Sequence, residues 1–361
     1  MSRFLSILML ISGMLAFAEN IHADETKIPV IYCSDLFHPH DDPDDHFDLA
    51  CIYAIHELEL KSIILGQGLK QAKKPGRIPV EQLNYMTGRN VPWAIGLSQA
   101  LKSPDDTGLD EPEKFQLGVS LIVKVLEESP VPVTIITVGS MRDVAATFNR
   151  RPKLFREKVS RIYAFIGDAS GAFREYNVTL DPKAYQRMMN AGLPLYWVPC
   201  FDGGPWKNKS GWASFWQAAH RDLLRDASTP VLNYFIYALL LKKEDPIAFL
   251  DKTTPEEERD KVLAGERNLW CSAVFPFVAD RKYVLRDDNC ISVPASEVRE
   301  SDKVTEIFDF QPVKVHVDGT GKETFSDDID TPLVNRFRIK NMENYSREMT
   351  SVTRELIKEL E

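Results

Sequence analysis

The sequence predicts an α/β protein with a mainly parallel central sheet and helices on both faces. Two observations support this prediction. Short apolar or β-branched runs, most of them without a charge, recur between residues 28 and 199, and segments with helical periodicity separate them. Strands that are apolar along their whole length are typical of parallel sheets buried on both sides.

The clearest strand is predicted at residues 131–138, which contain eight residues and no charge. The predicted strands are 28–33, 61–65, 91–95, 131–138, 161–166 and 193–199. The predicted helices are 49–60, 79–86, 114–128, 141–149 and 182–190. Because ligands bind beyond the carboxyl ends of parallel strands, the residues after each strand are the first candidates for a functional site.

The C-terminal part predicts a helical and β-hairpin appendage to this sheet. Residues 206–241 are aromatic-rich and are predicted to be mostly helical, and residues 245–267 form an exposed, charged helix–loop segment. In residues 309–325, apolar and polar side chains alternate on either side of Asp318-Gly319, which predicts a β-hairpin with its turn at these two residues. Residues 341–361 predict a polar helix. We expect residues 26–361 to form one domain.

The composition is that of a globular protein, with 44% hydrophobic and 27% charged residues. This excludes extended disorder and low-complexity scaffolds. The formal net charge of -9 disfavours nucleic acids and anionic membranes as partners, because an acidic surface repels phosphate groups. A small neutral ligand or a metal ion is easier to reconcile with this charge, and a homo-oligomer is compatible with the sequence.

Residues 1–23 predict a secretory signal peptide. Arg3 precedes an apolar run, and cleavage is expected after Ala18 or after Ala23. The apolar run is shorter than the roughly 20 residues that span a bilayer. A retained anchor is the alternative. We therefore expect an exported protein, periplasmic or secreted, that does not contact the membrane once the leader is removed.

The chain has five cysteines, so they cannot all pair within it, and no Cys-x-x-Cys spacing occurs. A small disulfide scaffold and a thiolate zinc site are therefore excluded. Most of these cysteines lie in apolar runs and are expected to be small buried hydrophobic residues, although one pair could bridge after export.

An acidic cluster follows the first predicted strand and is the most informative segment. Crowded carboxylates raise one another's pKa, and a divalent cation with oxygen ligands removes that cost. Carboxylates favour calcium or magnesium, whereas the histidines leave zinc or another transition metal open. A solvated loop with helix-capping aspartates is the alternative. The cluster comprises Asp35, His38, His40, Asp41, Asp42, Asp44, Asp45, His46 and Asp48.

Three motifs, each just after a predicted strand, resemble the inosine-uridine-preferring nucleoside hydrolase family. Residues 33–50 are similar to that family's Asp-x-Asp-Pro-Gly-x-Asp-Asp-Ala-x-Ala. Residues 139–143 are similar to its Gly-Pro-Leu-Thr-Asn. Ile166-Gly167-Asp168, followed by residues 175–177 and Asp181-Pro182, is similar to Met-Gly-Gly followed by Glu-Phe-Asn and Asp-Pro.

The resemblance implies a metal-dependent hydrolase of the N-glycosidic bond of a ribonucleoside or a related ribosyl compound. It implies Asp44 as the base that deprotonates water, beside a calcium ion that lowers the pKa of this water. Multidentate contacts would fix the sugar. The implied metal ligands are Asp35, Asp45 and the carbonyl of Val138, and the implied ribose ligands are Gln67, Glu175 and Asn177.

The chain departs from this pattern at several places. Cys33 stands where the family motif has its first aspartate, and the asparagine between Met-Gly-Gly and Glu-Phe-Asn has no clear counterpart. A longer loop, residues 38–42, replaces the Pro-Gly turn, and Asp42, or alternatively His40, from this loop is predicted to complete the metal site. Residues 268–273 match the C-terminal site segment but lack its aspartate and histidine, and Trp270 is predicted to stack on a base. A sugar-binding protein that has lost turnover, and a hydrolase for another sugar-containing substrate, are therefore kept as alternatives.

Overall fold

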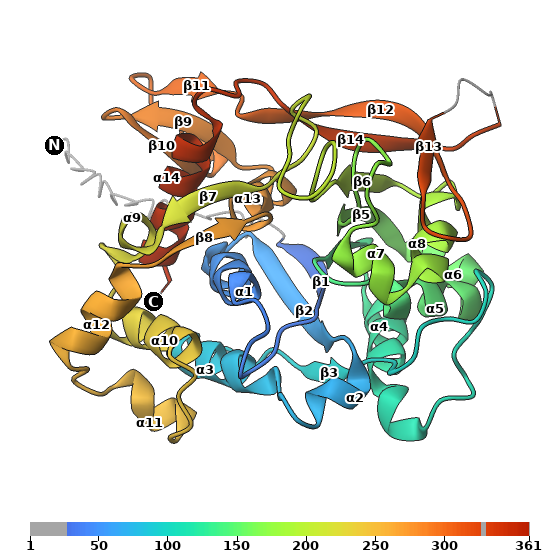
Figure 1. Ribbon diagram of the computed structural model, residues 1–361, viewed down its shortest axis with the longest axis horizontal. Helices are drawn as coiled ribbons and strands as arrows, with labels where there is room; N and C mark the ends of the chain where they lie inside the picture. Colours follow the sequence, from blue (N-terminus) through green and yellow to red (C-terminus); the bar gives the residue numbers. More distant parts are fainter. Residues whose placement is uncertain (1–26, 326–329, 361) are drawn as a thin grey trace, which may run out of the picture.

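The central sheet of the computed structural model has nine strands among the described residues, which are 27–325 and 330–360 (Figure 1). Their order across the sheet is β13 (Glu323–Phe325), β12 (Phe308–Val317), β14 (Leu333–Ile339), β6 (Leu195–Val198), β5 (Val159–Phe165), β4 (Val133–Thr137), β1 (Ile28–Ser34), β2 (Leu58–Leu65) and β3 (Trp93–Ile95). The seven strands from β14 to β3 run parallel, and β12 and β13 add antiparallel edge strands. This confirms the predicted fold class.

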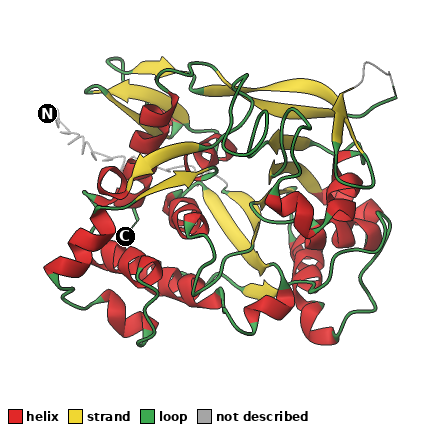
Figure 2. Ribbon diagram, viewed as in Figure 1, coloured by secondary structure: helices red, strands yellow, loops and turns green. Residues whose placement is uncertain are grey.

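Helices cover both faces of the sheet (Figure 2). One face packs against α1 (Asp44–Ala54), α3 (Arg77–Thr87), α10 (Thr229–Leu239), α13 (Phe275–Val278) and α14 (Tyr345–Lys358). The other packs against α4 (Leu117–Glu128), α5 (Arg142–Arg150), α6 (Pro152–Lys158) and α8 (Pro182–Met189). Strand β1 supplies both cores, because Val30 and Tyr32 face one and Ile31 and Cys33 the other.

The remaining elements lie at the periphery of these layers. The helices are α2 (Gly68–Gln71), α7 (Tyr176–Leu180), α9 (His220–Leu224), α11 (Pro246–Leu250) and α12 (Glu256–Leu263). Two small sheets join β7 (Trp216–Ala219) to β8 (Glu266–Leu269), and β9 (Lys282–Arg286) to both β10 (Asn289–Val293) and β11 (Lys303–Thr305). Short 3-10 turns occur at Glu113–Phe115, Ser272–Val274 and Ala295–Glu297.

Two secondary-structure predictions were wrong. The helix predicted at residues 49–60 is α1, which ends at Ala54, and Leu58 already opens β2 with Leu58 and Leu60 buried and Glu59 exposed. Residues 206–219 are loop and strand rather than helix, because Trp206 and Gly211 have positive φ angles that a right-handed helix does not contain. Helix α10 does form as predicted within the second half of that segment.

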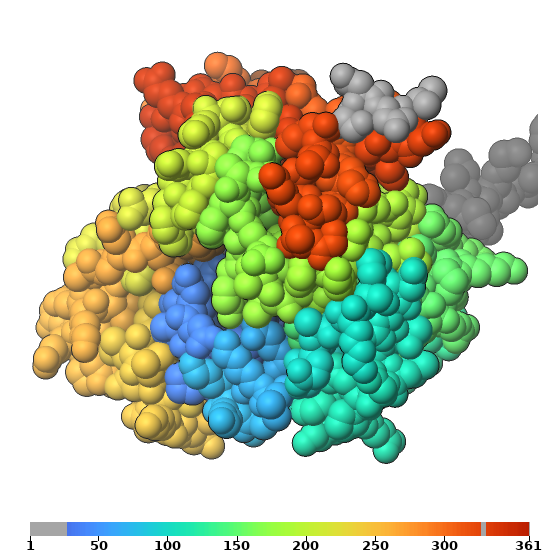
Figure 3. All heavy atoms as spheres, turned by 45° about the vertical axis from the view of Figure 1, so that its right-hand side comes forward, coloured from blue at the N-terminus to red at the C-terminus, as the bar shows by residue number. Residues whose placement is uncertain are grey.

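The C-terminal elements belong to the main architecture. The predicted hairpin forms from β12 and β13, and β12 extends the central sheet through β14. The hairpin packs over α8, where Asn190 Nδ2 donates to the Val317 carbonyl at 2.7 Å (Figure 3). Helix α14 presents a buried face with Met349 and Leu356.

All five cysteines are buried and free, as expected of small core residues. No helix in the described part of the chain is both long and apolar enough to cross a membrane. The predicted signal peptide lies within residues 1–26, outside the described residues.

Candidate active site

The candidate site lies where the order of the parallel strands reverses, between β1 and β4. Asp35 follows the last residue of β1, and Val138 follows the last residue of β4. The Val138 amide donates to the Cys33 carbonyl at 2.9 Å, which keeps the two strand ends together. Gly139 allows this approach, because a Cβ there would lie 2.7 Å from Oδ1 of Asp35. In doubly wound sheets this crevice is the usual ligand site.

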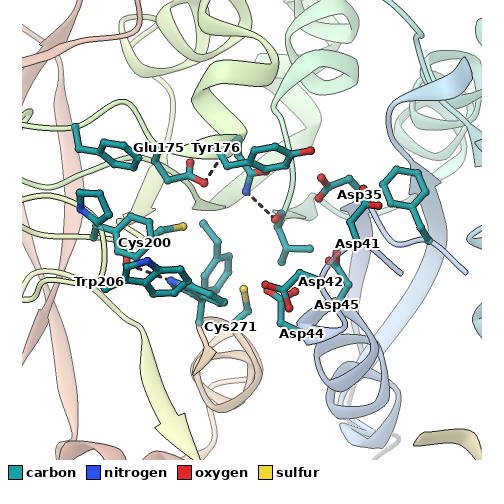
Figure 4. Close-up of a pocket in the computed structure, with 18 residues that line it drawn as sticks. Asp35, Asp41, Asp42, Asp44, Asp45, Glu175, Tyr176, Cys200, Trp206 and Cys271 are labelled. Atoms are coloured by element: carbon teal, nitrogen blue, oxygen red, sulfur yellow. Dashed lines mark hydrogen bonds between the residues drawn. The ribbon is translucent and has the colours of Figure 1, made fainter. Parts of the chain in front are cut away.

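A cavity of about 550 Å³ opens at this point (Figure 4). Carboxylates form one side and aromatic rings form the opposite side, with Trp206 and Cys200 facing Asp42, Asp44 and Asp45 across the space. The lining residues are Asp35, Phe37, Asp41, Asp42, Asp44, Asp45, Val138, Phe165, Phe173, Glu175, Tyr176, Asn177, Cys200, Phe201, Pro205, Trp206, Trp270 and Cys271.

The acidic side is formed by Asp35 and by the first two residues of α1, Asp44 and Asp45. Ser34 Oγ donates to Oδ1 of Asp45 at 2.7 Å, and Gln67 Nε2 donates to Oδ2 of Asp35 at 2.8 Å. Burial raises the pKa of Asp35 to about 6. Burial first and neighbouring carboxylates second raise the pKa values of Asp44 and Asp45 well above the ordinary value.

The donor chemistry at this side fits a hard divalent cation. Among the described residues, no lysine or arginine forms an ion pair with Asp35 or Asp45, so their mutual repulsion is left without a direct counter-charge. Oxygen donors are the ligands that calcium and magnesium prefer. The arrangement is incomplete as it stands, because within the described ranges no three His, Cys, Asp or Glu side chains are grouped so as to hold a metal ion.

The acidic residues of the long loop, residues 38–42, lie next to lysine and arginine side chains. Asp41 forms ion pairs with Lys70 and Lys74, and Asp42, with a 58% exposed side chain, lies 3.5 Å from Nη2 of Arg267. Asp42 lines the cavity and remains a predicted ligand.

The three histidines of the acidic cluster do not line the cavity. They lie near one another behind it, with the rings of His40 and His46 6.1 Å apart and the ring of His38 stacked on Tyr237 of α10. Burial lowers the pKa of each imidazole.

Two of the three residues that were predicted to bind ribose, Glu175 and Asn177, line the cavity. Glu175 caps α7, its carboxylate accepting from the amides of Asn177 at 2.9 Å and Gly167 at 3.1 Å. Burial raises the pKa of Glu175 to about 7. Asn177 Nδ2 donates to the Val138 carbonyl at 3.2 Å. Gln67 does not line the cavity, and its side-chain amide instead donates to Asp35.

The aromatic side joins residues from separate loops. Trp270 follows β8, and its indole Nε1 donates to the Cys200 carbonyl at 3.2 Å. Its ring lies 5.9 Å from Trp206 and 6.2 Å from Phe201. Trp206 lies in a segment that the sequence predicted to be mostly helical, but the residue is 58% exposed and its side chain lines the cavity. The preceding Asp202-Gly203-Gly204, whose two glycines are typical of a turn, is the sequence signal that could have indicated this.

Asp48 lies in α1 next to the residues that line the cavity, and the sequence did not indicate its contacts. It lies one turn after Asp44 in α1, and its Oδ1 accepts from Ser272 Oγ at 2.6 Å. Burial raises the pKa of Asp48 to about 6. This contact ties α1 to the segment that carries Trp270.

The fold and this cavity together define a doubly wound α/β protein with a carboxylate-lined and aromatic-lined site at its switch point. Residues 40–245, more than half of the chain, match the family model described as inosine-uridine preferring nucleoside hydrolase. The chain belongs to this family.

Relatives and solved structures agree with this assignment. The chain is 30% identical over 189 residues to a pyrimidine-specific ribonucleoside hydrolase of Enterobacter sp. (strain 638), and 29% identical to one of Citrobacter koseri. Each match covers 46% of this chain and 58% of the relative, so the chain spans little more than half the length of these relatives.

The fold is similar to those of a Bacillus anthracis inosine-uridine preferring nucleoside hydrolase (TM-score 0.53, 13% identity) and a plant nucleoside hydrolase (TM-score 0.57, 14% identity). Each comparison covers 92% of this chain and 99% of the other.

Proposed function

We propose that the protein hydrolyses the N-glycosidic bond of a ribonucleoside or a related ribosyl compound. The observation that carries the proposal is the cavity itself, which places clustered carboxylates opposite aromatic rings at the switch point of a nucleoside hydrolase fold. Aromatic rings suit a planar base, and carboxylates suit a polar sugar and the positive charge that develops on it.

Asp44 is the proposed base. Its carboxylate lines the cavity at the start of α1, and no hydrogen bond to its side chain is found among the described residues. An unpaired carboxylate in this position can take the proton of an attacking water. Glu175 and Asn177, which also line the cavity, are proposed to bind the ribose hydroxyls and so orient the sugar towards that water.

Calcium is the proposed cofactor, held by Asp35, Asp45 and the Val138 carbonyl, with Asp42 as a further ligand. Bound there, it would neutralise the crowded carboxylates and supply a Lewis acid beside the reacting water. The residues themselves keep these oxygens in place: Ser34 holds Asp45, Gln67 holds Asp35, and Asn177 holds the Val138 carbonyl.

Ribose release tests the proposal. The purified protein is incubated with inosine, uridine, adenosine and cytidine, with calcium and with a chelator, and free ribose is measured. We expect release that depends on the cation. The Asn268–Ala273 segment, which brings Trp270 and Cys271 but no carboxylate to the cavity, favours a second candidate, a ribosyl-binding protein without turnover. Tight nucleoside binding with no ribose release would support that candidate.

We further propose that the protein is exported. The support is the sequence of residues 1–23. Mass spectrometry of the exported protein is expected to find a new amino terminus at Glu19 or at Asp24. An intact amino terminus in the membrane fraction would instead identify a retained anchor.

A further inference from the structure

The turn after β6 carries Trp206 over the cavity. Two backbone hydrogen bonds close this turn, from the Asp202 amide to the Lys207 carbonyl at 2.8 Å and from the Lys209 amide to the Asp202 carbonyl at 3.1 Å. Gly203 and Gly204 have φ angles of 98° and 104°, and Trp206 has a φ of 59°. A tryptophan rarely adopts this left-handed conformation, so surrounding contacts must hold the turn.

Asp168, from the loop after β5, supplies those contacts. Its Oδ2 accepts from the Gly204 amide at 2.7 Å and its Oδ1 accepts from the Gly203 amide at 3.4 Å. The side chain is fully buried, and no lysine or arginine in the described ranges forms an ion pair with it. Two successive amides that point at one carboxylate form an anion-binding concavity in the backbone.

Asp168 is anchored on its other side as well. Its Oδ1 accepts from the Ser170 amide at 2.8 Å and from Ser170 Oγ at 2.5 Å. Its own amide donates to Oε1 of Glu323 in β13 at 3.4 Å, and Tyr185 donates to the same oxygen at 2.8 Å. The carboxylate therefore links the turn to a rigid part of the fold.

The contacts of Asp168 affect the cavity through the tip of the turn. Asp168 does not line the cavity, whereas Pro205 and Trp206 do. The Trp206 ring lies 5.3 Å from Phe201 and 5.9 Å from Trp270, and its side chain is 58% exposed (Figure 4). A ring with so much of its surface in solvent has few contacts that fix it, so the anchored backbone sets its place.

We propose that Asp168 is a positioning residue, which fixes Trp206 at the mouth of the cavity so that Trp206 and Trp270 receive the planar aglycone of the substrate. The inference rests on the proposed function, because it assigns the aromatic side of the same cavity to the base. In the family motif Met-Gly-Gly, which Ile166-Gly167-Asp168 resembles, a glycine stands at the position of Asp168.

A double-mutant cycle with Asp168→Asn and Trp206→Ala tests this role. An asparagine keeps one acceptor oxygen for Ser170 and Gly203. Its NH2 group, which can only donate, then faces the Gly204 amide, so that amide loses its acceptor. We expect Trp206→Ala to raise KM for inosine and uridine about fivefold to tenfold, with little change in kcat. Asp168→Asn should raise KM in the same way, and the double variant should be no worse than Trp206→Ala alone.

Ser160→Ala is the control, because its hydroxyl donates to the Val133 carbonyl and contacts neither Asp168 nor the turn. Hydrogen exchange gives a readout that needs no substrate: the Gly204 amide should exchange faster in Asp168→Asn and remain protected in Ser160→Ala. Effects that multiply in the double variant, a change confined to kcat, or unchanged exchange at Gly204 would each overturn the positioning role.

The cycle also separates this role from the proposed reaction. If the wild-type protein binds inosine without releasing ribose, the hydrolase proposal fails, and the same cycle is measured as Kd by calorimetry. Non-additive Kd values would then still support the positioning role, and additive values would contradict it.

Discussion

Gln67 donates from Nε2 to Oδ2 of Asp35 at 2.8 Å, and this contact joins the segment after β2 to the carboxylate after β1. Because Gln67 does not line the cavity, the structure favours a role in orienting Asp35 over direct contact with a sugar. Partners of this kind tune a metal site through its ligands.

Replacing Gln67 by alanine should therefore weaken calcium binding by roughly tenfold. At saturating calcium the KM for nucleosides should change little. Calorimetric titration with calcium and steady-state kinetics measure the two effects, with the exposed Gln99→Ala as the control. A raised KM with unchanged calcium affinity would instead favour the ribose contact that the family resemblance implied.

The acidic residues should contribute unequally to cation binding. Asp35→Asn should cause the larger loss of calcium affinity, because Asp35 is half-buried and has no ion-pair partner in the described part of the chain. Asp42→Asn should cause a smaller loss, because its exposed carboxylate is shared with Arg267. Titration of both variants checks the order. Unchanged affinity in Asp42→Asn would remove Asp42 from the ligand set.

Trp270→Ala should raise KM for nucleosides about fivefold to tenfold, because it removes an aromatic face from the cavity. Steady-state kinetics with inosine and uridine measure the effect. Trp212→Ala is a suitable control, because Trp212 packs against Arg336 and does not line the cavity. Equal KM values for the Trp270 variant and the wild type would argue against stacking.

Glu323 should make stability fall as pH rises. Burial raises its pKa from 4.5 to about 7, so the folded state accepts the protonated form and is penalised once the carboxyl ionises. This stability is fully present below pH 4.5 and is lost as pH rises through about 7. The difference between these two pKa values corresponds to a loss of about 3 kcal/mol in the free energy of unfolding.

Urea unfolding of wild type and Glu323→Gln at pH 4.5 and pH 8 measures this effect. The free energy of unfolding of Glu323→Gln should increase relative to that of the wild type as pH rises. That of the exposed Glu113→Gln variant should not. A difference between Glu323→Gln and wild type that is constant with pH would contradict the assignment.

The sequence predicted the parallel strands well because their apolar runs are continuous. It did not predict β14, whose Arg336 and Arg338 interrupt the apolar pattern near the sheet edge. Asp35, Asp44 and Asp45 were predicted at one place because they follow one strand closely in the chain. The aromatic side was mostly missed, because Phe173 comes from the loop after β5, Phe201 and Trp206 come from the loop after β6, and only the strand order brings these loops together.

The central claim is that Asp44 acts as a base in a site that also binds the nucleoside. Asp44→Asn keeps the size of the side chain but removes its ability to take a proton. We expect kcat for ribose release to fall by about 10² to 10⁴, with nucleoside binding retained. Asp41→Asn, whose carboxylate is held by Lys70 and Lys74 in the same loop, should remain active.

The decisive measurement is ribose release by wild type and Asp44→Asn at saturating calcium and nucleoside. The account predicts ready release by the wild type and almost none by the variant. Equal turnover in the two proteins would contradict it.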